Sequence, residues 1–367
     1  MRPYSTKSPI PSPGELCPED GHGGRFFKAV RESGAPEITD FSASINPLGI
    51  SKKALKAAKA ALALAVNYPD PAGEGFIDKL AAHFQIPPDC IIPANGSTEL
   101  IYLAPRALRP GAALLHAPAF SEYERACNAA GTKVSVINGL AFGRKKFLNT
   151  ITKIKPEMIF LCNPNNPTGG LIATDDILDI ATLARKMRSV LVLDEAFIDF
   201  CPGKSALPET ARNPYLIVLR SLTKFHALAG LRIGFAACHP ALKKRLLAFK
   251  EPWTVNVVAQ AAAIASLADL RYREKTLGLI AREKRYIEGR LEKASVWHFP
   301  SAANFYLARI KRHSEFIKTA FIKGVLIRDC SNFRGLAPTD ETGYIRFAVK
   351  RRKENRMLMD LLENWNC

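Results

Sequence analysis

The sequence of 367 residues lacks any uninterrupted apolar run near the roughly 18 residues that a membrane-spanning helix needs. Its first 20 residues are rich in proline and serine and lack the apolar core of a secretory signal peptide. The eight cysteines are widely spaced and include no Cys-x-x-Cys pair, so they indicate neither a disulfide framework nor a metal site. We therefore expect a cytoplasmic protein with no membrane partner and no metal.

Acidic residues are fewer than basic ones, which gives the chain a formal net charge of +18. Such a charge could reflect a nucleic-acid partner, a membrane surface or anionic small molecules. The basic residues are interleaved with Glu and Asp, however, and the densest cluster, Lys350 to Lys353, lies between a predicted strand and the last predicted helix. No helix-turn-helix segment is appended. We expect no nucleic-acid partner, whereas phosphorylated small molecules are compatible with the positive field.

The order of predicted elements indicates an α/β protein. Between residues 98 and 238, helices alternate with short apolar strands such as 158–163 and 190–195, which is typical of a mostly parallel central sheet sandwiched by helices. Beyond Pro240 the pattern changes to long helices and then to a few strands, including one predicted at 325–329. We predict a flexible N-terminal arm (1–20), an N-terminal segment joining the small domain and the active site (21–50), a large domain (51–250) and a small α+β domain (251–367).

One stretch, from Ser221 to Gly234, places hydroxyl side chains beside a lysine and an arginine. This is the layout of a pyridoxal-phosphate site, in which the amine of Lys224 would bond to the cofactor aldehyde. Ser221, Thr223 and Arg232 would hold the cofactor phosphate. Taken alone, the stretch is equally compatible with a solvated loop lysine, so the other segments must decide.

Two polar residues at predicted strand ends suit the rest of such a cofactor. Asp194 could keep the pyridine nitrogen protonated, although it could instead cap the next helix. Asn166 could donate its amide to the phenolic oxygen, although a plain turn is the alternative. Ligands of open α/β sheets bind beyond the carboxyl ends of the strands, where both residues and Lys224 are expected.

A predicted helix start and an aromatic segment complete the set. Gly96, Ser97 and Thr98 open a helix whose free N–H groups and hydroxyls could cradle the phosphate, although an ordinary helix cap explains them equally well. Phe120 could stack on the cofactor ring, with Tyr123 as the second choice. Aromatic residues in such positions more often belong to the core.

Taken in this order, the segments resemble the fold-type I pyridoxal-phosphate enzymes of the aspartate-aminotransferase superfamily. The resemblance covers nearly the whole chain from His22 and implies the aspartate-aminotransferase-like fold. Two families within it are close: the threonine-phosphate decarboxylases and the histidinol-phosphate aminotransferases. Phe197 stands where the aminotransferases usually have Tyr. The segments similar to the decarboxylases are His22-Gly23-Gly24, 40–49, 194–200, 221–225, 252–256 and 326–330.

The resemblance to the decarboxylases implies an activity. L-threonine O-3-phosphate would lose CO₂ to give (R)-1-amino-2-propanol O-2-phosphate for cobalamin side-chain synthesis. Decarboxylation of L-serine O-phosphate and a histidinol-phosphate-type transamination remain the alternatives. The family also implies a homodimer with shared active sites, in which Tyr68 of one chain reaches the cofactor phosphate of the other. Tyr68 could otherwise be an interface packing residue.

The resemblance also implies a substrate site for a small phosphorylated amino acid. Arg328 and Arg346 match the arginines that bind the substrate anions, and which of them takes the phosphate stays open. His22 and Asn256 are implied helpers, and Asn166 would contact the substrate as well as the cofactor. Ser44 stands where the decarboxylases typically have Asn, which leaves the contact there and the choice between threonine and serine phosphate open.

Overall fold

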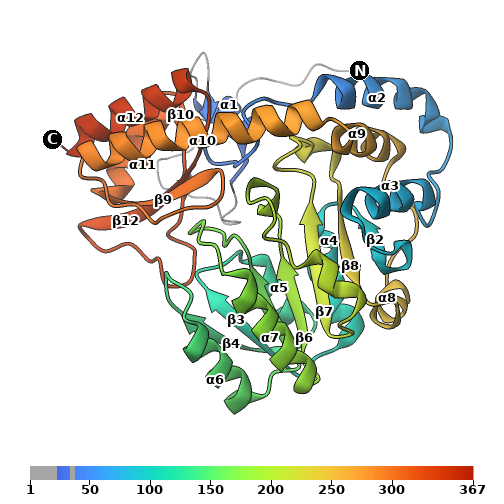
Figure 1. Cartoon of the computed structure of the whole chain (residues 1–367). Coiled ribbons are helices and arrows are strands. Elements are labelled where there is room, and N and C mark those ends of the chain that lie inside the picture. The colour runs from blue at the N-terminus through green and yellow to red at the C-terminus, as the bar shows by residue number, and fades with distance from the viewer. Residues whose placement is uncertain (1–22, 34–37, 367) are drawn as a thin grey trace, which may run out of the picture.

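The computed structural model describes residues 23–33 and 38–366 (Figure 1). The predicted arm over residues 1–20 lies outside these described residues. The chain between β2 and β8 builds a large sheet with helices on both sides, and a smaller sheet lies beside it with the C-terminal helices (Figure 1). The long helix α10, coloured orange, runs across the molecule between α9 and these C-terminal helices.

The elements have the following bounds. The α-helices are α1 (Phe26–Ser33), α2 (Lys52–Ala61), α3 (Glu74–Phe84), α4 (Ser97–Leu108), α5 (Glu122–Ala129), α6 (Arg144–Ile154), α7 (Thr174–Lys186), α8 (Pro240–Leu247), α9 (Val257–Leu267), α10 (Leu270–Lys293), α11 (His313–Ile322) and α12 (Arg352–Asn366). The strands are β1 (Thr39–Asp40), β2 (Ile91–Ala94), β3 (Ala112–Ala117), β4 (Lys133–Asn138), β5 (Met158–Cys162), β6 (Val190–Asp194), β7 (Leu216–Ser221), β8 (Gly234–Cys238), β9 (Phe305–Lys311), β10 (Val325–Leu326), β11 (Arg328–Asp329) and β12 (Thr342–Ala348). Short 3₁₀ helices include η1 (Leu62–Val66) and η3 (Ile198–Phe200).

The large sheet of the described residues has seven strands in the order β2-β8-β7-β6-β5-β3-β4. Strands β3 to β7 run parallel, while β8 is antiparallel to both of its neighbours. The mostly parallel sheet predicted from the sequence is therefore confirmed. The strand order reverses between β3 and β5, and a ligand is expected beyond the carboxyl ends of the strands at such a switch point.

Alternate residues of the buried strands face opposite helical layers. In β6, Val190 and Val192 pack with α4, α5 and α8, whereas Leu191 and Leu193 pack with α2, α3, α6, α7 and α9. Burying each such side chain contributes about 1.5–3 kcal/mol, so the strands are firmly held. Because successive side chains alternate, Asp194 at the end of β6 lies on the α4–α5 side, and Glu195 lies on the other side.

The smaller sheet has the order β11-β12-β9 and is antiparallel. The sequence predicted one strand over 325–329, which is wrong. Val325–Leu326 instead pairs in parallel with β1, and Arg328–Asp329 pairs with β12. The run is divided at Ile327 because its two halves bond to different partners, which a sequence pattern does not reveal.

Three elements of the large sheet region were not predicted from the sequence: α3, α6 and the edge strand β2. Helix α3 follows Gly73 in a left-handed conformation, and α6 follows Gly143, so neither N-cap residue has a side chain that could signal a helix start. None of the helices in residues 23–33 and 38–366 is long and apolar enough to cross a membrane.

Candidate active site

A cavity of about 490 Å³ lies beyond the carboxyl ends of β5, β6 and β7. We call it the active-site cavity. Segments far apart in the chain meet there, because the strand ends converge while the turn after β1 and the small sheet close the other side. Its lining includes most of the residues predicted from the sequence, namely Ser44, Ser97, Thr98, Phe120, Asn166, Asp194, Ser221, Thr223, Lys224, Arg232, Arg328 and Arg346.

One end of the cavity is built around the start of α4. Gly96 precedes this helix with φ 75°, in the region that favours glycine. A Cβ atom at Gly96 would collide with the guanidinium of Arg232. The missing side chain therefore lets the arginine approach the free N–H groups of the helix start, an arrangement suited to a phosphate.

Two hydroxyls from the end of β7 face the same region. Ser221 and Thr223 line the cavity, and their hydroxyl oxygens lie 2.7 Å apart. Both side chains are buried, so a ligand oxygen is a natural further partner for them. Together with Gly96 and Arg232 they form a cradle that fits the phosphate of pyridoxal phosphate.

Asp194 is the buried carboxylate of the cavity, with 4% of its surface exposed. Its Oδ2 accepts a 2.6 Å hydrogen bond from the Tyr123 hydroxyl, and its Oδ1 accepts one of 2.9 Å from the Ala196 N–H. Burial raises the pKa of Asp194, and these two hydrogen bonds oppose that rise. The carboxylate can therefore hold a positive charge on a pyridine ring in the cavity.

The stacking candidates divide into two roles. Tyr123 is 1% exposed, and its ring stacks on Phe160 at a centroid distance of 5.2 Å. It is therefore placed to orient Asp194, a contact that the sequence did not predict. Phe120 lines the cavity and meets Tyr123 edge-on, which leaves it the better placed of the two for a cofactor ring.

Lys224 lines the cavity between the carboxylate and the arginines. Burial, together with the positive charges of Arg346 and Arg232, lowers its pKa to about 8. Asp194 acts in the opposite direction. A lysine with this pKa is neutral far more often than an exposed one, and the neutral amine is the form that attacks an aldehyde.

Arg328 and Arg346 are cross-strand partners in β11 and β12. Arg346 donates to the Asn166 side-chain oxygen and, at 2.8 Å, to the Ser42 carbonyl oxygen. Arg328 donates to the Asp329 carbonyl oxygen and, at 2.7 Å, to the side chain of Asn332. Because the side-chain oxygen of Asn166 accepts from Arg346, the N–H₂ group of Asn166 can donate to a ligand in the cavity.

The turn after β1 holds Arg346 in place, and the sequence did not predict this role. Asp40 accepts hydrogen bonds of 2.7 Å from both the N–H and the hydroxyl of Ser42. The Ser42 carbonyl then accepts from Arg346, while Gly24 donates its N–H to the Ser42 hydroxyl at 2.9 Å. The Asp-x-Ser spacing signals such a turn, but not its distant partner.

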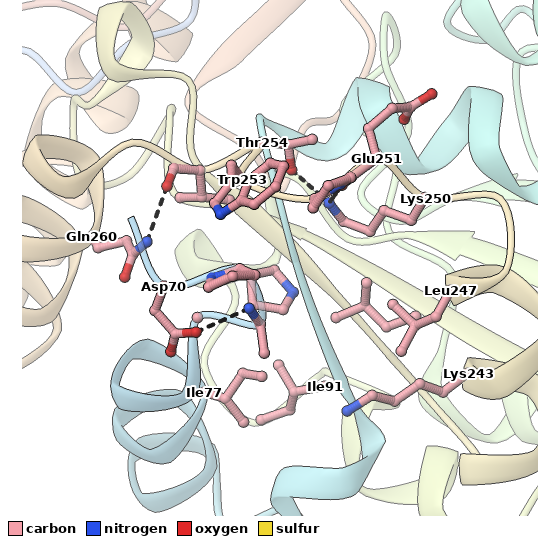
Figure 2. A pocket seen from close by; sticks show the side chains of 17 residues that line it. Asp70, Ile77, Ile91, Lys243, Leu247, Lys250, Glu251, Trp253, Thr254 and Gln260 are labelled. Carbon is pink, nitrogen blue, oxygen red and sulfur yellow. Dashed lines mark hydrogen bonds between the residues drawn. The ribbon is translucent and has the colours of Figure 1, made fainter. Parts of the chain in front are cut away.

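Asn256 and Tyr68, two predicted residues of the described chain, do not line the cavity. Asn256 caps α9 by accepting from the Ala259 N–H and donates to the Leu231 carbonyl oxygen. Tyr68 is 86% exposed and packs on Trp253, which lines a separate cavity of about 380 Å³, the Trp253 cavity (Figure 2). His22 lies outside the described residues.

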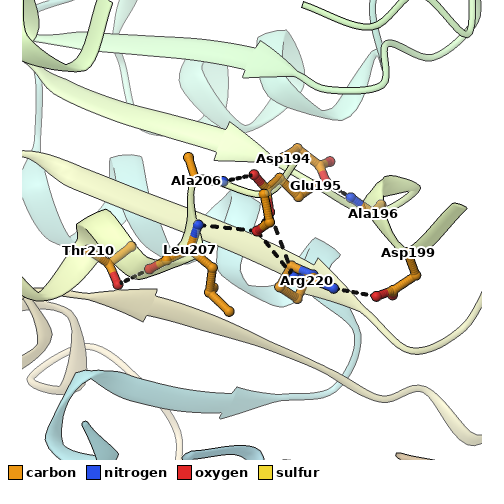
Figure 3. A network of polar contacts seen from close by, with 9 residues as sticks. Asp194, Glu195, Ala196, Asp199, Ala206, Leu207, Thr210 and Arg220 are labelled. Atoms are coloured by element: carbon orange, nitrogen blue, oxygen red, sulfur yellow. Dashed lines mark hydrogen bonds and ion pairs between the residues drawn. The ribbon is translucent and has the colours of Figure 1, made fainter. Parts of the chain in front are cut away.

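A buried ionic network lies beneath the site, on the other face of the sheet (Figure 3). Arg220 of β7 contacts Asp199 and lies 3.8 Å from Glu195, which also accepts from Ser205 and from the Ala206 N–H. Burial raises the pKa of Glu195 to about 7, although Arg220 opposes the rise. The network ties the end of β6, which carries Asp194, to the end of β7.

A lysine, a buried carboxylate and a phosphate cradle at the strand ends of this sheet define a pyridoxal-phosphate-dependent enzyme of the aminotransferase fold. The chain belongs to the family described as Aminotransferase class I and II, which residues 36–362 match. The fold and the cofactor predicted from the sequence are thereby confirmed.

Individual relatives include both kinds of enzyme. The chain is 32% identical to the threonine-phosphate decarboxylase of Salmonella typhimurium over 352 residues, 94% of this chain and 96% of the relative. A solved histidinol-phosphate aminotransferase from Clostridium acetobutylicum superposes with a TM-score of 0.81 at 28% identity, over 89% of this chain and 98% of that one. L-threonine-O-3-phosphate decarboxylase from Porphyromonas gingivalis superposes with a TM-score of 0.78 at 27% identity, over 88% and 98%.

Proposed function

We propose that the protein uses pyridoxal phosphate to decarboxylate L-threonine O-3-phosphate. The products are (R)-1-amino-2-propanol O-2-phosphate, a precursor of the cobalamin side chain, and CO₂. The observation that carries the proposal is a cavity with two buried arginines that form no ion pair with a carboxylate of the described residues. The similarity to two threonine-phosphate decarboxylases supports the choice of reaction.

The two arginines call for two anionic groups on the substrate. Arg328 and Arg346 are 6% and 7% exposed, and their hydrogen-bond partners are carbonyl and amide oxygens. Burial lowers the pKa of Arg346 to about 10. In the described part of the chain, neither arginine forms an ion pair with Asp or Glu. A buried charge without a counter-charge is unfavourable, so a ligand with a carboxylate and a phosphate would stabilise both.

Pyridoxal phosphate, when bound, supplies an electron sink for the bond that breaks at the substrate α-carbon. Lys224, with its low pKa, can hold a proton and return it to that carbon after CO₂ has left. Asp194 keeps a negative charge at the ring end of the cavity, and Tyr123 and Ala196 hold it in place. The arginines fix the carboxylate and phosphate of the substrate, which sets the bond that is oriented for cleavage.

Smaller polar groups complete the proposed substrate site. The Ser44 side chain is 1% exposed, and its hydroxyl lines the cavity without a hydrogen-bond partner among the described residues. A buried hydroxyl in this condition costs about 1–3 kcal/mol, so a substrate oxygen is a favourable partner. The free amide of Asn166 can serve the cofactor or the substrate, and His22 and Asn256 are proposed as helpers on the resemblance alone.

We also propose a homodimer in which Tyr68 of one chain serves the active site of the other. Tyr68, Trp253 and the η1 side chains Leu62, Leu64 and Val66 are all large apolar groups exposed in the single chain. A second subunit would cover them.

The cysteines of the described part are buried and free, which suits a cytoplasmic enzyme.

A product assay decides between the candidates. The purified holoenzyme is incubated with L-threonine O-3-phosphate and no keto acid, and CO₂ and the amino alcohol phosphate are measured. L-serine O-phosphate in a parallel reaction tests the second substrate. No release of CO₂ from either compound sinks the proposal. A keto-acid-dependent conversion of histidinol phosphate would then establish the aminotransferase alternative, which the similarity to the Clostridium structure favours.

A further inference from the structure

The loop from Ser331 to Leu336 lies in the connection between β11 and β12 and supports Arg328 in two ways. Asn332 accepts a 2.7 Å hydrogen bond from the Arg328 guanidinium, and the Phe333 ring lies under that guanidinium at 4.9 Å. Phe333 is 7% exposed and packs with Leu336 in a small apolar cluster. The orientation of Arg328 therefore depends on where this loop lies.

A further cavity gives the loop room to move. This side cavity, of about 380 Å³, is lined by Asn332, Phe333 and Arg334 from the loop and by Phe120 and Glu124 from the α5 region. Phe120 and Phe333 also line the active-site cavity, so the two rings belong to the walls of both. A loop beside an open volume lacks the close packing that fixes a core segment.

One contact fastens the loop across the side cavity. The Arg334 guanidinium forms an ion pair with the Glu124 carboxylate in the first turn of α5, joining residues 210 positions apart. Their side chains are 53% and 32% exposed. Glu124 follows Tyr123, which holds Asp194, so the pair links the support of Arg328 to the helix that supports the cofactor carboxylate.

We propose that Arg334 and Glu124 are positioning residues for substrate binding, which act through Asn332 and Phe333 on the orientation of Arg328. The inference rests on the proposed role of Arg328 as an anion-binding residue. Loss of the pair would let the loop shift into the side cavity and turn Arg328 away from the bound anion. In the described residues the loop makes no hydrogen bond or ion pair to Lys224 or to the phosphate cradle, so cofactor binding should be unchanged.

The test measures the Kd of O-phospho-L-threonine from the rapid absorbance change of the holoenzyme on mixing, which precedes turnover. Arg334→Met and Glu124→Gln should each raise the Kd roughly two- to fivefold, the range expected for a partly exposed ion pair. The cofactor absorbance maximum should stay the same. The double variant Glu124→Arg with Arg334→Glu should recover part of the loss, because the pair is restored in reverse although an arginine in the first turn of α5 opposes the helix dipole.

A matched control removes an exposed ion pair elsewhere. Arg144 of α6 pairs with Asp176 and Asp179 of α7, and the three side chains are 48%, 31% and 51% exposed. Arg144→Met should change thermal stability about as much as Arg334→Met does, and leave the Kd unchanged. Unchanged Kd values in both single variants, or a charge-reversed protein no better than either, would overturn the inference.

Failure of the proposed function gives a different result. If the wild-type protein does not bind O-phospho-L-threonine, the proposed substrate is wrong, and the same titration is made with inorganic phosphate. The Kd of phosphate should then rise by a similar factor in Arg334→Met. If Arg334→Met binds phosphate with the same Kd as the wild type, the positioning role is overturned as well.

Discussion

Tyr123 donates a 2.6 Å hydrogen bond to the buried carboxylate of Asp194, and both side chains are shielded from solvent. The tyrosine ring is fixed by its stacking on Phe160. Asp194 therefore has a rigid donor on one oxygen and the Ala196 N–H on the other. These two hydrogen bonds favour the ionised form of Asp194, whose pKa burial alone would raise.

Tyr123→Phe should lower activity while keeping the fold. The change removes one hydrogen bond to a charged group, worth about 1.5–3 kcal/mol, and preserves the stacked ring. We expect kcat/KM to fall about tenfold or more and the pKa of Asp194 to rise further. Steady-state kinetics measure the loss of activity, and thermal unfolding checks that the fold is kept. Tyr102→Phe is the control, because its hydroxyl bonds to Glu122 outside the cavity lining. An unchanged kcat/KM in Tyr123→Phe would contradict the role of the tyrosine.

Lys224 should control both cofactor bonding and a pH-dependent part of stability. Lys224→Ala should lose the absorbance of the covalently bound cofactor, and Lys284→Ala, at a half-buried lysine of lowered pKa outside the cavity lining, should keep it. The pKa of Lys224 is about 8 in the folded chain and about 10.4 when unfolded, so the unfolded state binds more protons in between. The cofactor-free protein should therefore gain stability as the pH rises from 8 to 10.4.

Thermal unfolding of the cofactor-free protein and of Lys224→Met across this range isolates the effect. The free energy of unfolding of the wild type, relative to that of Lys224→Met, should rise by about 1–3 kcal/mol as the pH rises from 8 to 10.4. A constant difference would show that Lys224 has an ordinary pKa.

Gly96→Ala should weaken cofactor binding because the added methyl group meets the guanidinium of Arg232. Loss of one charged contact to the phosphate predicts a Kd about tenfold higher or more. Gly131→Ala is a close control, since Gly131 has φ 74° against 75° at Gly96 but no atom within 4 Å of an added Cβ. Both variants place a side chain at a positive φ, so equal cofactor Kd values in the two would exclude the contact with Arg232 as the cause.

Arg220→Met should destabilise the protein strongly. The change leaves Glu195 and Asp199 buried without their cation, which costs about 3–5 kcal/mol. Arg290→Met removes a more exposed arginine from Asp360 and Glu363 and should cost about 1 kcal/mol. Denaturant unfolding gives both values. Combining Arg220→Met with Glu195→Gln should restore part of the loss, and no restoration would mean that lost packing on Phe84 dominates instead.

Much of the site could be predicted because its residues lie at the ends of elements that periodicity reveals. Lys224, Asp194 and Asn166 each follow a short apolar strand, and parallel strands of one sheet end at a common edge. The supporting residues could not be found in this way. Asp40, Tyr123 and Asn332 act on partners 71 to 306 positions away or through another side chain, and their local patterns are those of an ordinary turn, core residue or loop.

The sequence by itself determined the class of fold, the cofactor and most of the polar residues that line the active-site cavity, because alternating buried strands and helix starts are local properties. Only the tertiary structure decided how these residues are held. It divided the predicted strand 325–329 between two sheets and left Arg328 and Arg346 without a carboxylate partner in the described chain. It also joined the loop after β11 to α5 through Arg334 and Glu124. These relationships depend on which distant segments meet, and pairing across a fold is set by the packing of the whole chain.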